Sequence, residues 1–233
     1  MVTHTHTHTI IPNNFFNLLK EATEICEINL FEKVEWKELR SIGKFENGIG
    51  MPKTMFDEKG EIGAIHYGHI YTRYNLFVKN PIVKVSVDNA SKLKKLRSGD
   101  LVIAKTSENI GDIMKTIAYL GENEAVVGGH SAIFKHKEDP KYLSYVFNGA
   151  SYLINQKNKM ARGVKVIELS ATDMEKIKIP LPSLAVQKYI VSILNKFDTL
   201  INDLSQGLPK EIELRQKQYE YYREKLLNFP KED

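Results

Sequence analysis

The sequence predicts an α+β protein in which one mixed α/β domain is followed by a long helical, coiled-coil-like arm. Short apolar runs separated by turn dipeptides fill residues 31–180 without regular strand–helix alternation, which argues against a doubly wound nucleotide-binding sheet. Apolar residues then recur at steps of three and four through residues 181–229, the spacing of one face of a helix. An apolar fraction of 42% in 233 residues is ample for a buried core.

The first twelve residues are polar and repetitive, and we predict that residues 1–12 form a disordered tail. Its alternating His4, His6 and His8 could chelate a divalent metal ion on a flexible chain. Because structured metal sites need further ligands on a fixed scaffold, we predict no metal site here.

An amphipathic helix is predicted over residues 13–30. It begins after Asn13 and Asn14, which are good helix caps, and it docks either on its own domain or on a partner surface. Because Cys26 is the only cysteine, an internal disulfide is excluded. The apolar face of this helix comprises Phe15, Phe16, Leu18, Leu19, Ala22, Ile25 and Cys26.

The domain over residues 31–180 reads as short strands with one helix at residues 140–157. Turn dipeptides such as Asn47-Gly48, Gly99-Asp100 and Gly111-Asp112 separate the strand-like runs. The predicted strands are residues 63–66, 82–87, 101–104, 113–120, 125–127, 131–135 and 164–169.

Two helices are predicted in the arm, at residues 183–206 and 209–227, after a Pro-Leu-Pro at 180–182 and on either side of a breaker at 207–209. Seven-residue recurrence favours packing along another helix, such as that of a partner chain. From the residues alone, an ordinary helical hairpin that closes a core is supported equally well. The apolar stripe comprises Ile190, Ile193, Leu194, Phe197, Leu200, Ile201, Leu204, Ile212, Tyr219, Tyr222 and Leu226.

Charge is distributed unevenly along the chain. Residues 34–180 carry 23 basic and 17 acidic side chains, whereas residues 181–233 carry 8 of each. A basic domain beside a neutral arm suits a polyanionic partner, although an excess of this size is common on domains that bind nothing charged. The sequence contains no phosphate-binding G-x-x-x-x-G-K-S/T loop and no H-E-x-x-H motif, so we predict no catalytic residues. It also has no long apolar run of a membrane span and no secretory leader pattern, so we expect a cytoplasmic protein.

The segment IPLPSLAVQKYIVSILNKFDTLINDLSQGLPKEIELRQKQYEYYREKLLNF closely resembles the helical region of the specificity subunit of type I restriction-modification systems. The segments VEWKELRSIGKFENGIGMPK, IHYGHIYTRY, GDLVIAKTSENIGD, GGHSAIFKH and ARGVKVIELSATDMEKIKIPLP resemble the target recognition domain of the same subunits. The resemblance implies a non-catalytic reader of double-stranded DNA. It implies modification subunits that methylate adenine with S-adenosylmethionine, restriction subunits that use ATP and Mg, and no cofactor in this chain.

Polar residues in the predicted loops are the candidates for DNA contacts, since basic side chains hold phosphates and polar side chains read base edges. Singly, each of these loops is no more than a surface turn. The phosphate or guanine candidates are Lys53, Arg73, Lys105 and Arg162, and the candidate polar readers are Tyr67, His69, Thr106, Ser107, Asn109 and His130.

The chain departs from the family pattern in having one recognition domain and one helical region, where a full specificity subunit has two of each. The simplest solution is a homodimer with antiparallel arms, which would read a split palindromic site. A truncated product, or half of a longer subunit, is the alternative. Two further hypotheses remain: a module that bridges helical partners without binding DNA, and an enzyme such as a metal-dependent nuclease that uses the histidine tail.

Overall fold

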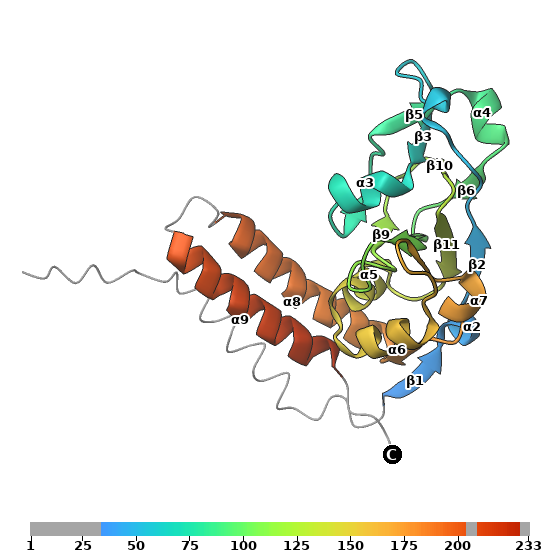
Figure 1. The fold of residues 1–233 in the computed structure, drawn as a ribbon. Helices are drawn as coiled ribbons and strands as arrows, with labels where there is room; N and C mark the ends of the chain where they lie inside the picture. Colours follow the sequence, from blue (N-terminus) through green and yellow to red (C-terminus); the bar gives the residue numbers. More distant parts are fainter. Residues whose placement is uncertain (1–33, 204–208, 229–233) are drawn as a thin grey trace, which may run out of the picture.

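The computed structural model describes residues 34–203 and 209–228, so the predicted tail and N-terminal helix lie outside the described residues. In the described part, two β-sheets stack on each other, helices cover the outer face of the larger sheet, and two long C-terminal helices run side by side away from it (Figure 1).

The larger sheet has five strands in the order β2-β11-β7-β9-β4. Its edge strand β4 runs parallel to β9, and the other neighbours are antiparallel. The strands are β2 (Gly43–Asn47), β4 (Phe77–Val78), β7 (Leu101–Ala104), β9 (Thr116–Tyr119) and β11 (Ser131–His136).

The smaller sheet has four strands in the order β5-β3-β10-β6, with β3 and β10 parallel. These strands are β3 (Ile62–Ile65), β5 (Val83–Val85), β6 (Lys94–Leu96) and β10 (Ala125–Val127). A 3-10 turn, η1 (Lys53–Met55), and two short helices, α3 (Tyr67–Thr72) and α4 (Val87–Ser91), accompany this sheet.

Strand β7 shows why the layers stack in this way. All four of its residues are apolar and buried, so both faces must be covered. Leu101 and Ile103 belong to the core cluster shared with the long helices, whereas Val102 and Ala104 belong to the cluster between the two sheets. Because successive side chains along a strand point to opposite faces, the larger sheet lies between these two cores.

Two small pairs of strands complete the domain. β1 (Glu35–Glu38) pairs antiparallel with β13 (Lys178–Leu181), which leads directly into the C-terminal helices. β8 (Thr106–Ser107) pairs antiparallel with β12 (Ile167–Glu168). The one-turn helices α2 (Leu39–Ile42) and α7 (Ala171–Met174) lie near β2.

The predicted helix at 140–157 is two helices, α5 (Pro140–Gly149) and α6 (Tyr152–Met160). The side chain of Asp139 caps α5 by accepting from the backbone N–H groups of Lys141 and Tyr142. The helix breaks because Ala150 is extended (φ −84°, ψ 120°), directly after Gly149, where a Cβ would meet the Arg223 side chain at 2.9 Å.

Other predicted boundaries shift for local reasons. The strand predicted at 113–120 begins only at Thr116, since Met114 has a left-handed backbone (φ 67°). The strand predicted at 82–87 ends at Val85, because the Ser86 side chain caps α4. Of the strand predicted at 164–169, only β12 forms. The strand predicted at 63–66 ends at Ile65, and residues 67–72 form helix α3, which was not predicted.

The C-terminal helices are α8 (Leu184–Asp203) and α9 (Pro209–Leu227), close to the predicted bounds. They form a hairpin that packs on α5. The described residues of the predicted apolar stripe do not form an exposed face. Six of them are buried in the main core cluster, and the seventh, Tyr222, is half-buried against that cluster. These residues are Ile190, Ile193, Leu194, Phe197, Tyr219, Tyr222 and Leu226.

The assignment of these side chains to a partner helix is therefore corrected, and the hairpin that closes a core is what the structure shows for them. The side chains of Leu200, Ile201, Leu204 and Ile212 lie outside the described set. No helix within 34–203 or 209–228 combines the length and apolarity needed to cross a membrane.

Candidate nucleic-acid interface

Nine of the ten sequence candidates lie on segments that the fold joins through contacts around α3 and β8. The Tyr71 hydroxyl donates to the carbonyl of Thr106 (2.8 Å), which fixes α3 against β8. The Lys105 N–H donates to the carbonyl of His130 (2.8 Å), and Arg162 forms a bridge with Glu168 next to β12, the partner of β8. Segments separated by tens of residues in the sequence thus become neighbours.

A shallow hollow of about 330 Å³ lies between a glycine-rich turn, residues 48–53, and the start of α3. The rings of Tyr67 and His130 face each other across it at 5.0 Å between centroids. His130 has a left-handed backbone (φ 60°), which places its ring at this position. The hollow is lined by Gly50, Met51, Pro52, His66, Tyr67, Gly129 and His130.

The glycine-rich turn approaches its neighbour too closely for a side chain. A Cβ at Gly48 would lie 2.0 Å from the carbonyl oxygen of Gly128, whereas a Cβ at Gly50 would meet nothing within 4 Å. The close approach lets Ile49 bridge to Gly128 and sets the wall of the hollow. The turn ends at Lys53, an exposed side chain on η1.

Two histidines at α3, the N-cap His66 and His69, have lowered pKa values, which favours their neutral form. Burial lowers the pKa of His66, and the charges of His69, Lys53 and His130 lower it further. Burial also lowers the pKa of His69, with Arg73 and Lys53 adding to the effect. A neutral imidazole offers one donor and one acceptor, as a base-reading side chain requires. His69 Nδ1 is buried without a hydrogen-bond partner, and the His66 ring caps α3 by accepting from the Gly68 N–H (3.2 Å).

Asn109 differs from the other candidates because its side chain is engaged within its own turn. Its Oδ1 accepts from the Asp112 N–H (2.9 Å) and its Nδ2 donates to an Asp112 carboxylate oxygen. Asn109 therefore shapes the loop more than it faces outward. Sequence reasoning missed Tyr71 and Lys115, whose Nζ donates to the Tyr71 carbonyl (3.4 Å); no local pattern distinguishes them, since their partners are far along the chain.

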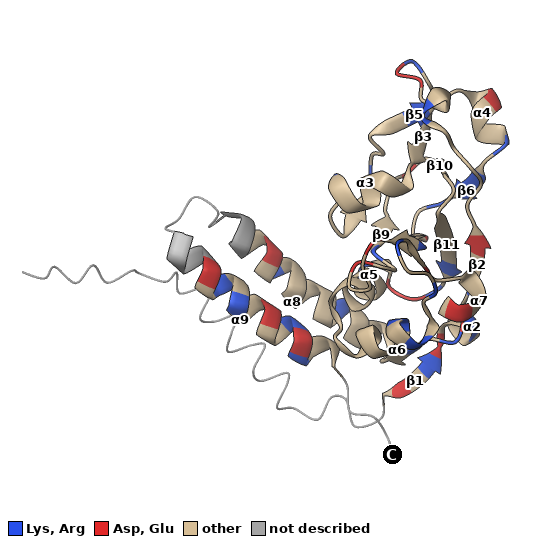
Figure 2. Cartoon of the chain, viewed as in Figure 1, with Lys and Arg blue, Asp and Glu red and all other residues tan. Residues whose placement is uncertain are grey.

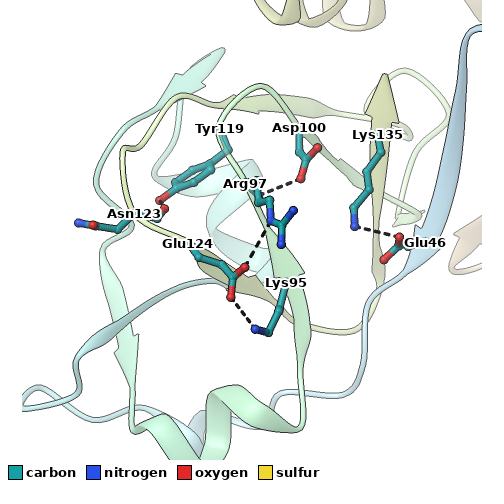
Figure 3. Close-up of polar contacts among 8 residues, drawn as sticks. All are labelled: Glu46, Lys95, Arg97, Asp100, Tyr119, Asn123, Glu124 and Lys135. Carbon is teal, nitrogen blue, oxygen red and sulfur yellow. Dashed lines mark hydrogen bonds and ion pairs between the residues drawn. The ribbon is translucent and has the colours of Figure 1, made fainter. Parts of the chain in front are cut away.

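Basic residues at a different edge of the sheets are already paired. Figure 3 shows Lys95 and Arg97 on the carboxylate of Glu124, and Lys135 on that of Glu46, with distances of 2.8, 3.4 and 2.9 Å. The Arg97 N–H also donates to an Asp100 carboxylate oxygen (2.8 Å), and the Tyr119 hydroxyl to the Asn123 carbonyl (2.6 Å). These cations are partly neutralised on the protein itself. Figure 2 shows the blue Lys and Arg positions on β6 and the red Asp and Glu position on β2.

By contrast, none of the four candidate cations forms an ion pair with another described residue. Their side chains are therefore available to anions in solution. They are Lys53, Arg73, Lys105 and Arg162.

Comparison with known proteins agrees with the resemblance seen in the sequence. The family model described as type I restriction modification DNA specificity domain matches residues 32–214. The chain is 34% identical over 207 residues to the Escherichia coli type I restriction enzyme EcoR124I/EcoR124II specificity subunit, covering 85% of this chain and 49% of that protein. It is 31% identical over 205 residues to a putative type I specificity subunit of Haemophilus influenzae, covering 87% and 50%.

Solved structures show the same fold at low sequence identity. A chain from a type I R-M system has a TM-score of 0.57 at 16% identity, covering 92% of this chain and 54% of that one. The HsdS subunit from Thermoanaerobacter tengcongensis has a TM-score of 0.53 at 16% identity, covering 91% and 52%. The chain spans about half the length of the relatives it matches. On the match over residues 32–214, this chain belongs to the family of type I restriction-modification DNA specificity domains.

Proposed function

We propose that this chain reads the DNA target for a type I restriction-modification complex and directs adenine methylation and restriction by partner subunits. One observation carries the proposal: Lys53, Arg73, Lys105 and Arg162 lack protein ion pairs among the described residues and lie on or beside the segments that carry the polar loop side chains. Unpaired cations supply phosphate contacts, and the neighbouring hydroxyl, amide and imidazole groups supply base contacts.

The proposal assigns chemistry to the partners and recognition to this chain. Modification subunits hold S-adenosylmethionine, restriction subunits hold ATP and Mg, and this chain holds no cofactor. It acts in the cytoplasm, where its DNA target lies.

The binding test compares Lys105→Ala and Arg162→Ala with Lys95→Ala on cognate duplex over a range of salt concentrations. Removing one phosphate contact lowers the slope of log affinity against log salt by about 0.9, which at 0.15 M salt is about a fivefold loss. Lys95→Ala is the matched control because Lys95 already pairs with Glu124 at 2.8 Å. If the first two variants keep both affinity and slope, these residues do not touch DNA. If the unmodified chain binds no duplex above competitor DNA, the bridging-module hypothesis stands instead.

We further propose a homodimer that reads a split palindromic site. Two large apolar side chains on the outer face of α9, Leu214 and Tyr221, are 56% and 53% exposed and lie seven residues apart. That spacing suits a second helix packing along α9.

The dimer test uses these exposed residues, since Ile193→Asp would disrupt the buried core. Light scattering at tens of micromolar should give a dimer for the unmodified chain and a monomer for Leu214→Asp plus Tyr221→Asp. A monomer in both samples would refute the homodimer and leave DNA recognition untouched.

Genome-wide mapping of methylated adenines after co-expression with the modification subunit tests both proposals. A gapped palindrome supports recognition by a symmetric dimer. A gapped motif with two different halves supports recognition by this chain together with a second, different recognition domain.

A further inference from the structure

One loop at the candidate interface exposes apolar side chains to solvent. Val164 is 97% exposed and Val166 is 58% exposed, so neither is covered by the described chain. Val164 is the most exposed of the large apolar side chains in the described residues. Burying a valine side chain stabilises a fold, and this residue makes no such contribution here.

The loop is held firmly at its base. The Arg162 N–H donates to the Glu168 carbonyl (2.9 Å) and the Glu168 N–H to the Arg162 carbonyl (2.7 Å), which closes residues 162–168 into a hairpin. Gly163 has a φ of 113°, and a Cβ there would lie 2.1 Å from the carbonyl oxygen of Val166. The turn thus requires glycine and holds the two valines away from the domain.

The hairpin stands directly beside the candidate DNA contacts. Ile167 pairs with Ser107 and Glu168 with Thr106 in the β8–β12 ladder. The N–H of Leu169, which is fully buried, donates to the carbonyl of Lys105 (2.9 Å). Any ligand that contacts Lys105 and Thr106 therefore lies within reach of the hairpin.

Charge around the tip favours DNA as this ligand. Arg162 and Lys165 flank Val164, both are exposed, and neither forms an ion pair with a described residue. Glu168, the one carboxylate of the hairpin, lies at its base rather than its tip. An apolar side chain at the centre of the tip can contact a thymine methyl group, and the cations at its sides can contact the neighbouring phosphates. Valine is short and branched, unlike the longer Phe, Leu, Ile and Met side chains that wedge between base steps.

We propose that residues 162–168 form a base-reading finger in which Val164 contacts the 5-methyl group of a thymine in the major groove. Arg162 and Lys165 hold the adjoining phosphates, so Val164 is a specificity-determining residue. This inference rests on the proposed DNA-reading function.

The experiment uses the complex of this chain with its modification subunit and a duplex carrying its mapped site, with each thymine replaced in turn by deoxyuridine. At one position in a half-site, loss of the methyl group should weaken binding about fourfold, because burying one such group is worth about 0.8 kcal/mol. Val164→Ser should weaken binding to the unmodified duplex by a similar factor and become insensitive to deoxyuridine at that position. Val87→Ser is the matched control: Val87 is 54% exposed at the start of α4 and should bind like the unmodified chain.

The possible failures are distinguishable. If the unmodified complex shows no preferred motif, the proposed function itself fails. If it shows a motif and Val164→Ser keeps the same motif and affinity, the finger is refuted and the function stands. If Val164→Ser weakens binding while no deoxyuridine substitution does, the valine does not contact a thymine methyl group and the inference is overturned.

Discussion

Replacing Lys157 with methionine should stabilise the protein at neutral pH. Lys157 lies on α6, is buried, and lines a cavity between the recognition domain and the C-terminal hairpin. Burial lowers the pKa of its ammonium group from 10.5 to about 8, against a smaller opposing effect of the Asp112 carboxylate. Methionine has a similar volume and carries no charge, so it keeps the packing and removes the desolvation cost.

The magnitude follows from proton linkage. The difference between 10.5 and about 8 corresponds to about 3 kcal/mol at roughly 1.4 kcal/mol per pH unit. Below pH 8 Lys157 is protonated in both the folded and the unfolded chain, so the full desolvation cost of its charge lowers the stability of the folded state. Between pH 8 and 10.5 the unfolded chain binds more protons, so the stability of the unmodified protein rises with pH and the advantage of methionine shrinks.

Urea denaturation at pH 7 and pH 9.5 tests this reasoning. Lys157→Met should raise the free energy of unfolding by about 2–3 kcal/mol at pH 7, and by about 2 kcal/mol less at pH 9.5. Lys159→Met is the matched control, because Lys159 lies on the same helix with an exposed side chain and should change nothing at either pH. A gain that is absent at pH 7, or that does not change with pH, would refute the assignment of a desolvated charge.

Three further predictions concern other positions in the domain. Burial lowers the pKa of His136 to about 4, so the stability of the protein should fall as the pH drops below 6.5. In calorimetric unfolding, His136→Asn should lessen the loss of stability between pH 7 and pH 5 by about 2 kcal/mol. An equal loss in the variant and the unmodified protein would contradict this prediction. Tyr145→Phe removes the hydroxyl that donates to Asp198 and should cost about 1–3 kcal/mol, with faster amide exchange in α8; unchanged exchange would show that this bond does not hold the hairpin. Gly48→Ala should destabilise the protein by more than about 2 kcal/mol in urea while Gly50→Ala does not, and equal effects would refute the close approach at the hollow.

Some elements were predictable because a local pattern decides them. β7 and β10 form as the sequence indicates, since each is a short apolar run bounded by polar or turn residues and must be buried. α9 begins at Pro209 and ends at Leu227 as predicted, because proline at the first turn and the end of the periodic pattern mark its limits. In these cases the signal lies within the element itself.

Other features depend on partners far along the chain. α3 was not predicted because its cap is a histidine ring and its anchor is the Tyr71 bond to Thr106, 35 residues away. The stripe on α8 predicted a buried face correctly but could not say which chain buries it. The candidate interface likewise assembles only when the strand order β2-β11-β7-β9-β4 brings distant loops together.

The C-terminal helical hairpin of α8 and α9 is connected to the finger through hydrogen bonds and helix α6. Gln187 near the start of α8 accepts from the Asp139 N–H (2.9 Å) and donates to the Pro182 carbonyl (2.9 Å), which fixes α8 to the start of α5. Glu224 of α9 accepts from the N–H and hydroxyl of Ser151, the N-cap residue directly before α6.

Helix α6 then runs nine residues, from Tyr152 to Met160, and Arg162 opens the finger two residues later. Because a helix rises about 1.5 Å per residue, this path fixes the separation of finger and hairpin base to a nearly constant value. In a homodimer held by the arms, the spacing of the two half-sites would therefore depend on α6 as well as on the arms. Changing the length of α6 should then change the length of the gap between the half-sites without changing the bases read.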